Sequence, residues 1–535
     1  MNEHFDVIII GTGAGGGTLL HRLAGSGKRI LVLERGPFLP REKDNWNYHG
    51  SFKYYSSEVM FNKDGGEIRP GFSYHVGGNT KVFGAALFRL REKDFESFRH
   101  HDGVSPEWPL KYRDWEPYYT QAEELYQVHG QAGADPTDPW RTKDYPHPPI
   151  SHEPRIAEVF NELKARGLKP YPAPMGIRIN EAAMHLSPCI RCDTCDGYPC
   201  MIHAKSDAEV IGVRPSLPKP NVTLLTEAKV LRLNTSPSGR EITSVIVDVK
   251  GERTVFSADV VVVACGAVNS SALLLRSADE KHPAGLANSS GLVGRNLMKH
   301  VLGSLIGVST LKANPSKFQK TMALNDFYWG EPGYAFPMGN VQLMGRTPLE
   351  GFRAQAEQFA PLTPEEVAQH AIEWWLTTED LPDPTNQVRV NGSGIVIDYT
   401  ENNGAAFDRL LNRWTGILKE MNGNAAGIKT GYFPTKMPMH SLGHQVGTCK
   451  FGEDAQTSVL NLDCRAHDVD NLYVVDGSFF VSSGAVNPTL TIVANALRVG
   501  DHLLQRLGAR TAESASSSRG NGTLKTPVMP EMAIA

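Results

Sequence analysis

The stretch FDVIIIGTGAGGGTLLHRLAGSGKRILVLE, residues 5–34, decides the fold of the N-terminal part of the chain. Residues 5–10 are an apolar, β-branched run, which predicts a strand that is buried on both faces. A glycine-rich turn follows, then a predicted helix over residues 18–24 and a second strand over residues 29–34. This order predicts one βαβ unit of a parallel sheet.

The turn of this unit matches the G-x-G-x-x-G pattern at Gly11, Gly13 and Gly16, with Ala14 inside it. The first glycine permits a tight turn out of the strand, the second lets the backbone approach a pyrophosphate, and the third lets the helix pack closely on the sheet. The phosphates would lie at the helix N-terminus, and Glu34 could accept hydrogen bonds from ribose hydroxyls. The motif predicts a dinucleotide site and by itself allows either FAD or NAD.

The bulk composition is that of a soluble globular protein. At 535 residues the chain is long enough for two to four domains, or for one large domain with insertions. Its net charge of −4 provides no strong field that would attract nucleic acid or an anionic membrane. No apolar run approaches the roughly 18 residues of a membrane span. The first residues lead straight into a strand without a signal peptide, so we expect a cytoplasmic protein with neither nucleic acid nor membrane as a partner.

Further α/β elements are expected in the middle of the chain and near its end. Strands are predicted at residues 221–225, 230–233, 244–249, 258–264 and 471–476, and helices at 112–130, 154–166, 267–275 and 490–504. Residues 37–110 lack a clean period, which predicts a loop-dominated segment. Aromatic and polar residues mix over residues 301–435, and we interpret this segment as a sheet-based substrate domain.

The nucleotide-binding domain is therefore expected in separate pieces. Residues 1–300 would form its main part, with loop-rich and cysteine-rich insertions, and residues 436–510 would return to it with catalytic residues. The substrate domain, residues 301–435 with parts of 60–200, would be inserted between them. Residues 511–535 begin Ser-rich and lack periodicity, which predicts a disordered tail.

Four separated motifs carry a resemblance to a known family. They are VGGNTKVFG at 76–84, VVVACGA at 261–267, HQVGT at 444–448, and DGS at 476–478 followed by Asn487-Pro488. In this order they resemble the glucose–methanol–choline (GMC) oxidoreductases over nearly the whole chain. The resemblance implies an α/β protein in which a Rossmann-like FAD-binding domain carries an inserted sheet-based substrate domain. It also makes FAD the expected cofactor in place of NAD.

The resemblance also implies which residues contact the FAD. Beyond the N-terminal turn they are Gly77, Gly78, Asn79, Val230, Asp476, Gly477, Asn487, Pro488 and Thr489. Some family members tether the flavin through a histidine four residues after the second glycine of the 77–78 pair, and Val82 stands there in this chain. Valine cannot form that bond, so we expect non-covalent FAD. His75 lies on the wrong side of the glycines for this role.

His444 and Asn487 are the predicted catalytic residues. His444 resembles the family histidine that precedes a Gly-Thr turn, and an imidazole with a pKa near the working pH suits the removal of a hydroxyl proton. Asn487 resembles the second active-site position, which is His or Asn in the family, and its amide could donate a hydrogen bond to the developing alkoxide. His440 is the competing candidate for the base.

Four of the seven cysteines crowd into twelve residues: Cys189, Cys192, Cys195 and Cys200. Their C-x2-C-x2-C-x4-C spacing is close to that of bacterial ferredoxins but has a longer last gap. Structural thiols or local disulfides, an iron–sulfur cluster, and a zinc site with His203 in reserve all stay open. We assign no metal.

The function expected from the resemblance is oxidation of an alcohol to a carbonyl, with hydride transfer to the flavin and electrons passed to O2 or another acceptor. An oxidase is favoured over a dehydrogenase. Residues 77–89 resemble bacterial pyranose oxidases and glycoside 3-oxidases, which favours a sugar or glycoside substrate; a pyranose ring could stack on Trp374, Trp375 or Trp414. The alternatives are a dehydrogenase for a non-sugar alcohol and an FAD-containing lyase without redox chemistry. The oligomeric state stays open.

Overall fold

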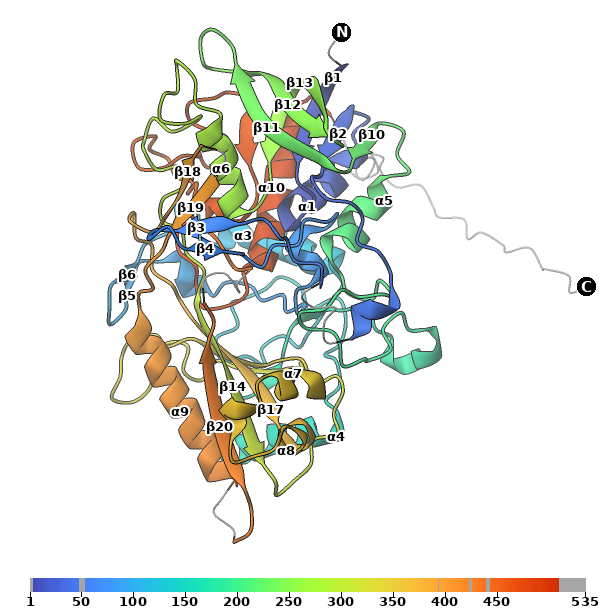
Figure 1. Cartoon of the computed structure of the whole chain (residues 1–535), viewed down its shortest axis with the longest axis vertical. Helices are drawn as coiled ribbons and strands as arrows, with labels where there is room; N and C mark the ends of the chain where they lie inside the picture. The colour runs from blue at the N-terminus through green and yellow to red at the C-terminus, as the bar shows by residue number, and fades with distance from the viewer. Residues whose placement is uncertain (1–2, 48–52, 393, 423–425, 439–442, 510–535) are drawn as a thin grey trace, which may run out of the picture.

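In the computed structural model the structure describes residues 3–47, 53–392, 394–422, 426–438 and 443–509. The predicted tail over 511–535 and the candidate base His440 lie outside these residues. Two large sheets divide the molecule into an upper and a lower part in Figure 1, and the N-terminal strand lies in the upper one. No helix among the described residues is long and apolar enough to span a bilayer.

The upper sheet is the nucleotide-binding sheet. Its strands run in the order β10-β2-β1-β13-β12-β11, and β21 also pairs with β13. Their bounds are β1 Glu3–Ile10, β2 Ile30–Leu33, β10 Val222–Leu225, β11 Ala228–Thr235, β12 Ile242–Val249, β13 Glu252–Val263 and β21 Leu472–Val474. Strands β10, β2, β1, β13 and β21 pair in parallel, whereas β11, β12 and the first half of β13 form an antiparallel extension.

Three helices pack against this sheet or share its core. They are α1 Ala14–Ala24, α6 Ala267–Arg276 and α10 Thr489–Arg506. α10 packs on α1 and on α3, Tyr112–Leu125. Leu19, Leu23, Val493 and Leu497 belong to the core that these helices share with the strands. The first and the last described helices of the chain are thus neighbours in space, as Figure 1 also shows.

The lower sheet has the order β20-β14-β17-β16-β15-β8. Its strands are β8 Tyr171–Pro172, β14 Val301–Ser309, β15 Met322–Leu324, β16 Asn340–Leu343, β17 Ile372–Thr378 and β20 Thr430–Lys436. α9, Gly404–Asn422, and α4, Pro154–Ala165, share a core with this sheet. Trp374 and Trp414 are fully buried there, with ring centroids 4.8 Å apart, so these two tryptophans are core residues.

A smaller sheet, β18-β19-β3-β4, joins distant parts of the chain. Its strands are β3 Met60–Asn62, β4 Glu67–Ile68, β18 Gln387–Asn391 and β19 Gly394–Asp398. It shares a core with Val268 and Ala272 of α6, so part of segment 301–435 packs on the nucleotide-binding part. The remaining elements are η1 Lys43–Trp46, η2 Gly78–Lys81, η3 Glu92–Phe95, β5 Phe98–Arg99, β6 Val104–Ser105, β7 Val128–His129, β9 Met175–Gly176, η4 Glu181–Leu186, η5 Glu209–Val213, α5 Arg214–Ser216, α7 Leu349–Ala354, η6 Ala356–Phe359, α8 Pro364–His370 and η8 Gly477–Phe479.

Several predicted elements differ in extent from the observed ones. The helix predicted over residues 112–130 ends at Leu125 and is followed by β7. The first helix begins at Ala14 and not at Thr18, because the last glycines of the turn already adopt helical geometry. Strand β13 begins at Glu252, six residues before the predicted start, because its first half pairs with β12 in the antiparallel extension.

Candidate active site

A cavity of about 550 Å³ lies at the carboxyl ends of the parallel strands and extends to the lower sheet. Ile10, Leu33 and Ala264 mark the ends of β1, β2 and β13 along its wall, whereas Gln342 and Trp375 come from the lower sheet. Open parallel sheets bind ligands at this edge, and the volume is in the usual range of a ligand site. The cavity therefore has one end at the glycine-rich turn, called the nucleotide end below, and a polar end to which the lower sheet contributes Gln342 and Trp375.

The phosphate turn is shaped by close backbone packing on one side and open space on the other. A Cβ atom at Gly11, whose φ is +97°, would overlap the carbonyl oxygen of Ala264, and one at Gly16 would overlap that of Gly11. At Gly13 a Cβ atom would meet no protein atom within 4 Å. Gly11, Gly13 and Ala14 line the cavity, but Gly16 does not. Its role is therefore to let α1 approach the turn.

Glu34 lies at the nucleotide end and is tied to the phosphate turn. Its carboxylate accepts hydrogen bonds from Thr12 N at 3.1 Å, from Thr12 Oγ1 at 2.5 Å and from Gly36 N at 3.0 Å. Burial raises the pKa of Glu34, although these donors act against the shift. Val230 of β11 lines the same end. Glu34 thus fixes the turn and still presents a carboxylate to the cavity.

Only some residues of the loop predicted to lie beside the flavin, the loop that begins at Gly77, line the cavity. Gly78, Asn79 and Val82 line it, whereas Gly77 does not. Gly77 has a φ of +99° and donates its N–H to Thr12 Oγ1 at 3.0 Å, so it connects this loop to the phosphate turn. His75 is outside the cavity lining.

The carboxylate of Asp476 is also occupied by hydrogen bonds from neighbouring loops and is not free. It accepts from Gly266 N at 2.9 Å, from Ser478 N at 2.8 Å and from the hydroxyl of Ser270. Gly477 beside it lines the cavity. Asp476 therefore holds two cavity loops in place.

Two helix N-termini open on the cavity without a side-chain cap. They are Gly13-Ala14 of α1 and Pro488-Thr489 of α10, and all four residues line the cavity. Uncapped N-termini favour bound negative charge. Together with the open space beside Gly13, they fit a dinucleotide whose pyrophosphate lies against α1. The residues present therefore fit FAD.

The polar end brings the two predicted catalytic residues together. Asn487 Nδ2 lies 3.3 Å from His444 Nε2, and both residues line the cavity. His444 Nδ1 lies 3.0 Å from Nδ1 of His300, a fully buried residue whose Nε2 is 3.0 Å from Ser483 O. The sequence analysis missed His300, since no local motif marks it.

The pKa of His444 differs from the expected one. Burial lowers it to about 3, with His300 and Lys320 acting in the same direction, and burial lowers the pKa of His300 to about 4. The expectation that His444 has a pKa near the working pH is therefore wrong for this state of the protein. Both imidazole rings are neutral at physiological pH. Asp196 acts in the opposite direction and would stabilise a proton that arrives on His444.

A buried ion pair completes the polar end, and sequence reasoning missed it too. Asp196 accepts from Lys320 Nζ at 2.7 Å and from Trp375 Nε1 at 3.1 Å, and all three residues line the cavity. Gln342 also lines the cavity; its Oε1 is buried without a hydrogen-bond partner among the described residues. Of the three tryptophans considered for sugar stacking, only Trp375 reaches the site.

The cysteine cluster lies next to this end, since Cys195 precedes Asp196. All seven cysteines are free thiols. Cys189 Sγ accepts from Arg191 N at 3.4 Å and Cys200 Sγ from Ala204 N at 3.2 Å. Burial raises the pKa of Cys189 to about 11. Among the described residues, no group of three or more His, Cys, Asp or Glu side chains is arranged to hold a metal ion.

Comparison with protein families identifies two matching regions. Residues 54–302 and residues 420–496 match the N-terminal and C-terminal family models, both described as GMC oxidoreductase. A crystal structure of pyridoxine 4-oxidase from Mesorbium loti has a TM-score of 0.64 at 18% identity and covers 94% of this chain and 99% of its own. The predicted α/β fold with FAD-binding and substrate-binding domains is confirmed by these matches.

Relatives with named activities match along most of the chain. Paromamine 6'-oxidase of Streptomyces fradiae is 31% identical, covering 92% of this chain and 90% of its own. 2-Methyl-1,2-propanediol dehydrogenase of Mycolicibacterium austroafricanum is 26% identical, covering 94% and 96%. Pyranose 2-oxidase of Tricholoma matsutake is 31% identical but matches only 24% of this chain, so the expected special likeness to pyranose oxidases does not extend over the whole fold.

Proposed function

Because this chain belongs to the GMC oxidoreductase family of FAD-dependent enzymes that act on CH–OH groups, we propose that it oxidises a hydroxyl of a neutral sugar or glycoside to a carbonyl. The observation that carries this proposal is the polar end of the cavity. There His444 Nε2 and Asn487 Nδ2 lie 3.3 Å apart, beside an ion pair and the amide oxygen of Gln342, which lacks a hydrogen-bond partner among the residues that the structure describes.

The FAD would be held without a covalent bond. Gly13 and the N-terminus of α1 would accommodate the pyrophosphate, Glu34 and Val230 the adenosine, and the loop at Gly78 the flavin ring. When bound there, FAD supplies the hydride acceptor. Val82 cannot tether it, so denaturation in acid should release the yellow colour into the supernatant; colour that stays with the precipitate would show a covalent link.

His444 is the base in this proposal, and its surroundings leave the correct nitrogen free. Ser483 O can only accept a hydrogen bond, so Nε2 of neutral His300 carries the proton and its Nδ1 is a bare acceptor. His444 Nδ1 must then donate to His300 Nδ1, which leaves the lone pair of His444 Nε2 directed at the cavity. Nε2 takes the hydroxyl proton, His300 Nδ1 accepts the hydrogen bond from Nδ1 of the resulting imidazolium, and Asp196 acts to stabilise its positive charge.

Asn487 is the second partner of the substrate oxygen. Its Nδ2 donates toward His444 Nε2 when no substrate lies between them. A hydroxyl group inserted at this point accepts from Asn487 and donates to His444. As the proton leaves, the hydrogen bond from Asn487 strengthens because the oxygen gains negative charge.

Three features of the same end support a neutral, hydroxyl-rich substrate. Asp196 and Lys320 neutralise each other, so this ion pair leaves no net charge for an ionic substrate group. Gln342 Oε1 has no partner within the described part of the chain and can accept a hydrogen bond from a second hydroxyl. The Trp375 ring offers an apolar face beside these groups.

Dioxygen is the proposed electron acceptor. Its support is that paromamine 6'-oxidase, at 31% identity, bears an oxidase name, although a dehydrogenase matches at 26%. A screen of neutral sugars, glycosides and paromamine-type amines, read by peroxide formation and by dye reduction in parallel, tests acceptor and substrate together. We expect peroxide with a neutral sugar or glycoside; dye reduction without peroxide would identify a dehydrogenase.

The reaction class has a separate test. Mixing the holoenzyme anaerobically with the same compounds should bleach the flavin, because the hydride stays on the cofactor. A lyase of this fold would turn over without bleaching. Bleaching only by the amines would contradict the proposed neutral substrate.

A further inference from the structure

A file of one carboxylate and four amide side chains, all buried except the half-buried Asn487, leads to the catalytic pair. Its members, in order, are Asp135, Asn325, Asn340, Gln342 and Asn487. Asn325 Nδ2 donates to Asp135 Oδ2 at 2.8 Å, and Asn340 Nδ2 donates to Asn325 Oδ1 at 2.8 Å. Gln342 Nε2 then donates to Asn340 Oδ1 and to Asn487 Oδ1, both at 3.0 Å.

The direction of this file decides what Asn487 presents to the substrate. A side-chain amide donates at one end and accepts at the other, and turning it over changes its shape little. A carboxylate accepts only, so Asp135 forces Asn325 to turn its nitrogen toward it. The orientation of each following amide is then fixed by the one before it. As a result, Asn487 turns its oxygen toward Gln342 and its nitrogen toward His444.

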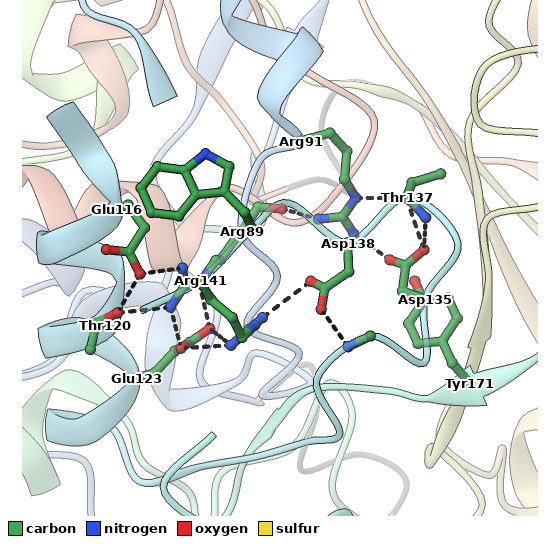
Figure 2. Close-up of polar contacts among 12 residues, drawn as sticks. Arg89, Arg91, Glu116, Thr120, Glu123, Asp135, Thr137, Asp138, Arg141 and Tyr171 are labelled. Carbon is green, nitrogen blue, oxygen red and sulfur yellow. Dashed lines mark hydrogen bonds and ion pairs between the residues drawn. The ribbon is translucent and has the colours of Figure 1, made fainter. Parts of the chain in front are cut away.

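The carboxylate at the start of the file is itself held in place. Asp135 pairs with Arg91 Nη2 at 3.1 Å and accepts from Thr137 N and Thr137 Oγ1, each at 2.8 Å (Figure 2). The guanidinium is always charged, so it favours the ionised, acceptor-only form of its partner. Tyr171, which Figure 2 shows beside Asp135, receives a further hydrogen bond from Asn325 Nδ2 at 2.8 Å.

We propose that Asp135 is a positioning residue: through Asn325, Asn340 and Gln342 it orients the Asn487 amide so that Nδ2 faces the reacting oxygen. Asp135 does not line the cavity, so it would not touch a substrate or cofactor bound there. Without the acceptor-only carboxylate of Asp135, the Asn487 amide could turn over and place Oδ1 against the lone pair of His444 Nε2. The kinetic test of this role rests on the proposed function. The structural test depends only on where the hydrogen atoms of the Asn487 amide lie.

The structure offers a matched control three residues away. Asp138 pairs with Arg141 Nη2 at 3.1 Å and accepts from Gly133 N at 3.0 Å. Figure 2 shows this pair in the adjacent cluster around Arg89. Asp135 and Asp138 are comparably buried and each pairs with one arginine, but none of the hydrogen bonds of Asp138 leads to the amide file.

Asp135→Asn and Asp138→Asn should therefore differ in the holoenzyme. With D-glucose and with glycerol as probes, D135N should lower the anaerobic flavin reduction rate roughly 3- to 10-fold at saturation, the range for one neutral hydrogen bond, with little change in the half-saturating concentration. D138N should keep the parent rate. In an Asn487→Ala background D135N should cause no further loss, because it acts through Asn487.

Equal losses in D135N and D138N, or a full additional loss from D135N in the Asn487→Ala background, would overturn the proposal. If the wild type is bleached by none of the neutral sugars and glycosides of the screen, the proposed function fails, and a neutron structure of the deuterated wild-type protein still decides the inference. Deuterons on the Asn487 side-chain nitrogen facing His444 support it, and the reverse orientation refutes it.

Discussion

The two ends of the cavity are built in different ways. At the nucleotide end, Thr12 and Glu34 are 22 residues apart and belong to one βαβ unit. At the reactive end, His300 contacts His444 across 144 residues, Gln342 contacts Asn487 across 145, and Lys320 contacts Asp196 across 124. The first end follows from a local pattern, whereas the second exists only where both sheets meet. Changes at the two ends should therefore separate cofactor binding from catalysis.

The largest expected effect is at the reactive end. His444→Ala should lower the rate of anaerobic flavin reduction by about 10²- to 10⁴-fold, since it removes the proposed general base. FAD content should stay at the parent level, because the phosphate turn is untouched. His129→Ala is the control: that buried histidine bonds Pro148 O and is outside the cavity lining. A His444→Ala enzyme with the parent rate would remove His444 from the mechanism.

The second effect tests the residue that orients the base. His300→Leu removes the acceptor for His444 Nδ1, a charge-assisted bond once His444 is protonated, so the rate should fall roughly 10- to 150-fold. His300→Asn retains an acceptor near the position of Nδ1 and should recover most of this loss. Stopped-flow reduction at saturating substrate provides the measurement. If the Asn and Leu variants were equally slow, the hydrogen bond would not be the cause.

The third effect is at the nucleotide end and concerns FAD binding. Gly13→Ala places a methyl group in the open space beside the turn, and the overlap with a bound pyrophosphate should weaken FAD binding by about 1–3 kcal/mol. Reconstituted protein that is saturated with FAD should keep its reduction rate. Gly25→Ala, at the end of α1 and also free of neighbours within 4 Å, should change neither property. Titration of apoprotein with FAD distinguishes these outcomes.

The smallest effect is a pH dependence of stability. The pKa values of His300 and His444 are lowered below the ordinary value, so between about pH 6.5 and 4 the unfolded chain binds protons that the folded protein does not. The free energy of unfolding therefore falls as the pH drops below 6.5, by about 2 kcal/mol per histidine at pH 5. This stability is fully present above that range.

Buried acids change the stability with pH in the opposite direction. The measurement must therefore compare the wild type with a histidine variant. Asp94 and Asp380 have pKa values raised to about 7 by burial, and they contribute stability that is lost as the pH rises. Denaturant unfolding of the wild type and of His300→Asn at pH 7.5 and pH 5 isolates the histidine contribution. The variant should lose about 2 kcal/mol less than the wild type; an equal loss would contradict the assignment.

Local patterns predicted more of the fold than of the site. The βαβ unit, the antiparallel strands at 230–249 and the helix ending the chain's α/β part all appear, because alternation of apolar residues and glycine spacing are local properties. His444 and Asn487 were found through motifs. Asp196, His300, Lys320 and Gln342 were not, since each is an ordinary polar residue in its own segment and gains a role only from partners more than one hundred residues away.

The sequence by itself determined the dinucleotide turn, the family and the two residues proposed to bind the reacting oxygen, because these depend on residue type at short spacing. Only the tertiary structure decided that Gly16 and Gly77 serve backbone packing, that His444 is neutral, and that Asp135 can act on Asn487. The reason is physical: burial sets a pKa, and the direction of a hydrogen-bond chain is set by its far end. Neither quantity belongs to any one segment of the chain.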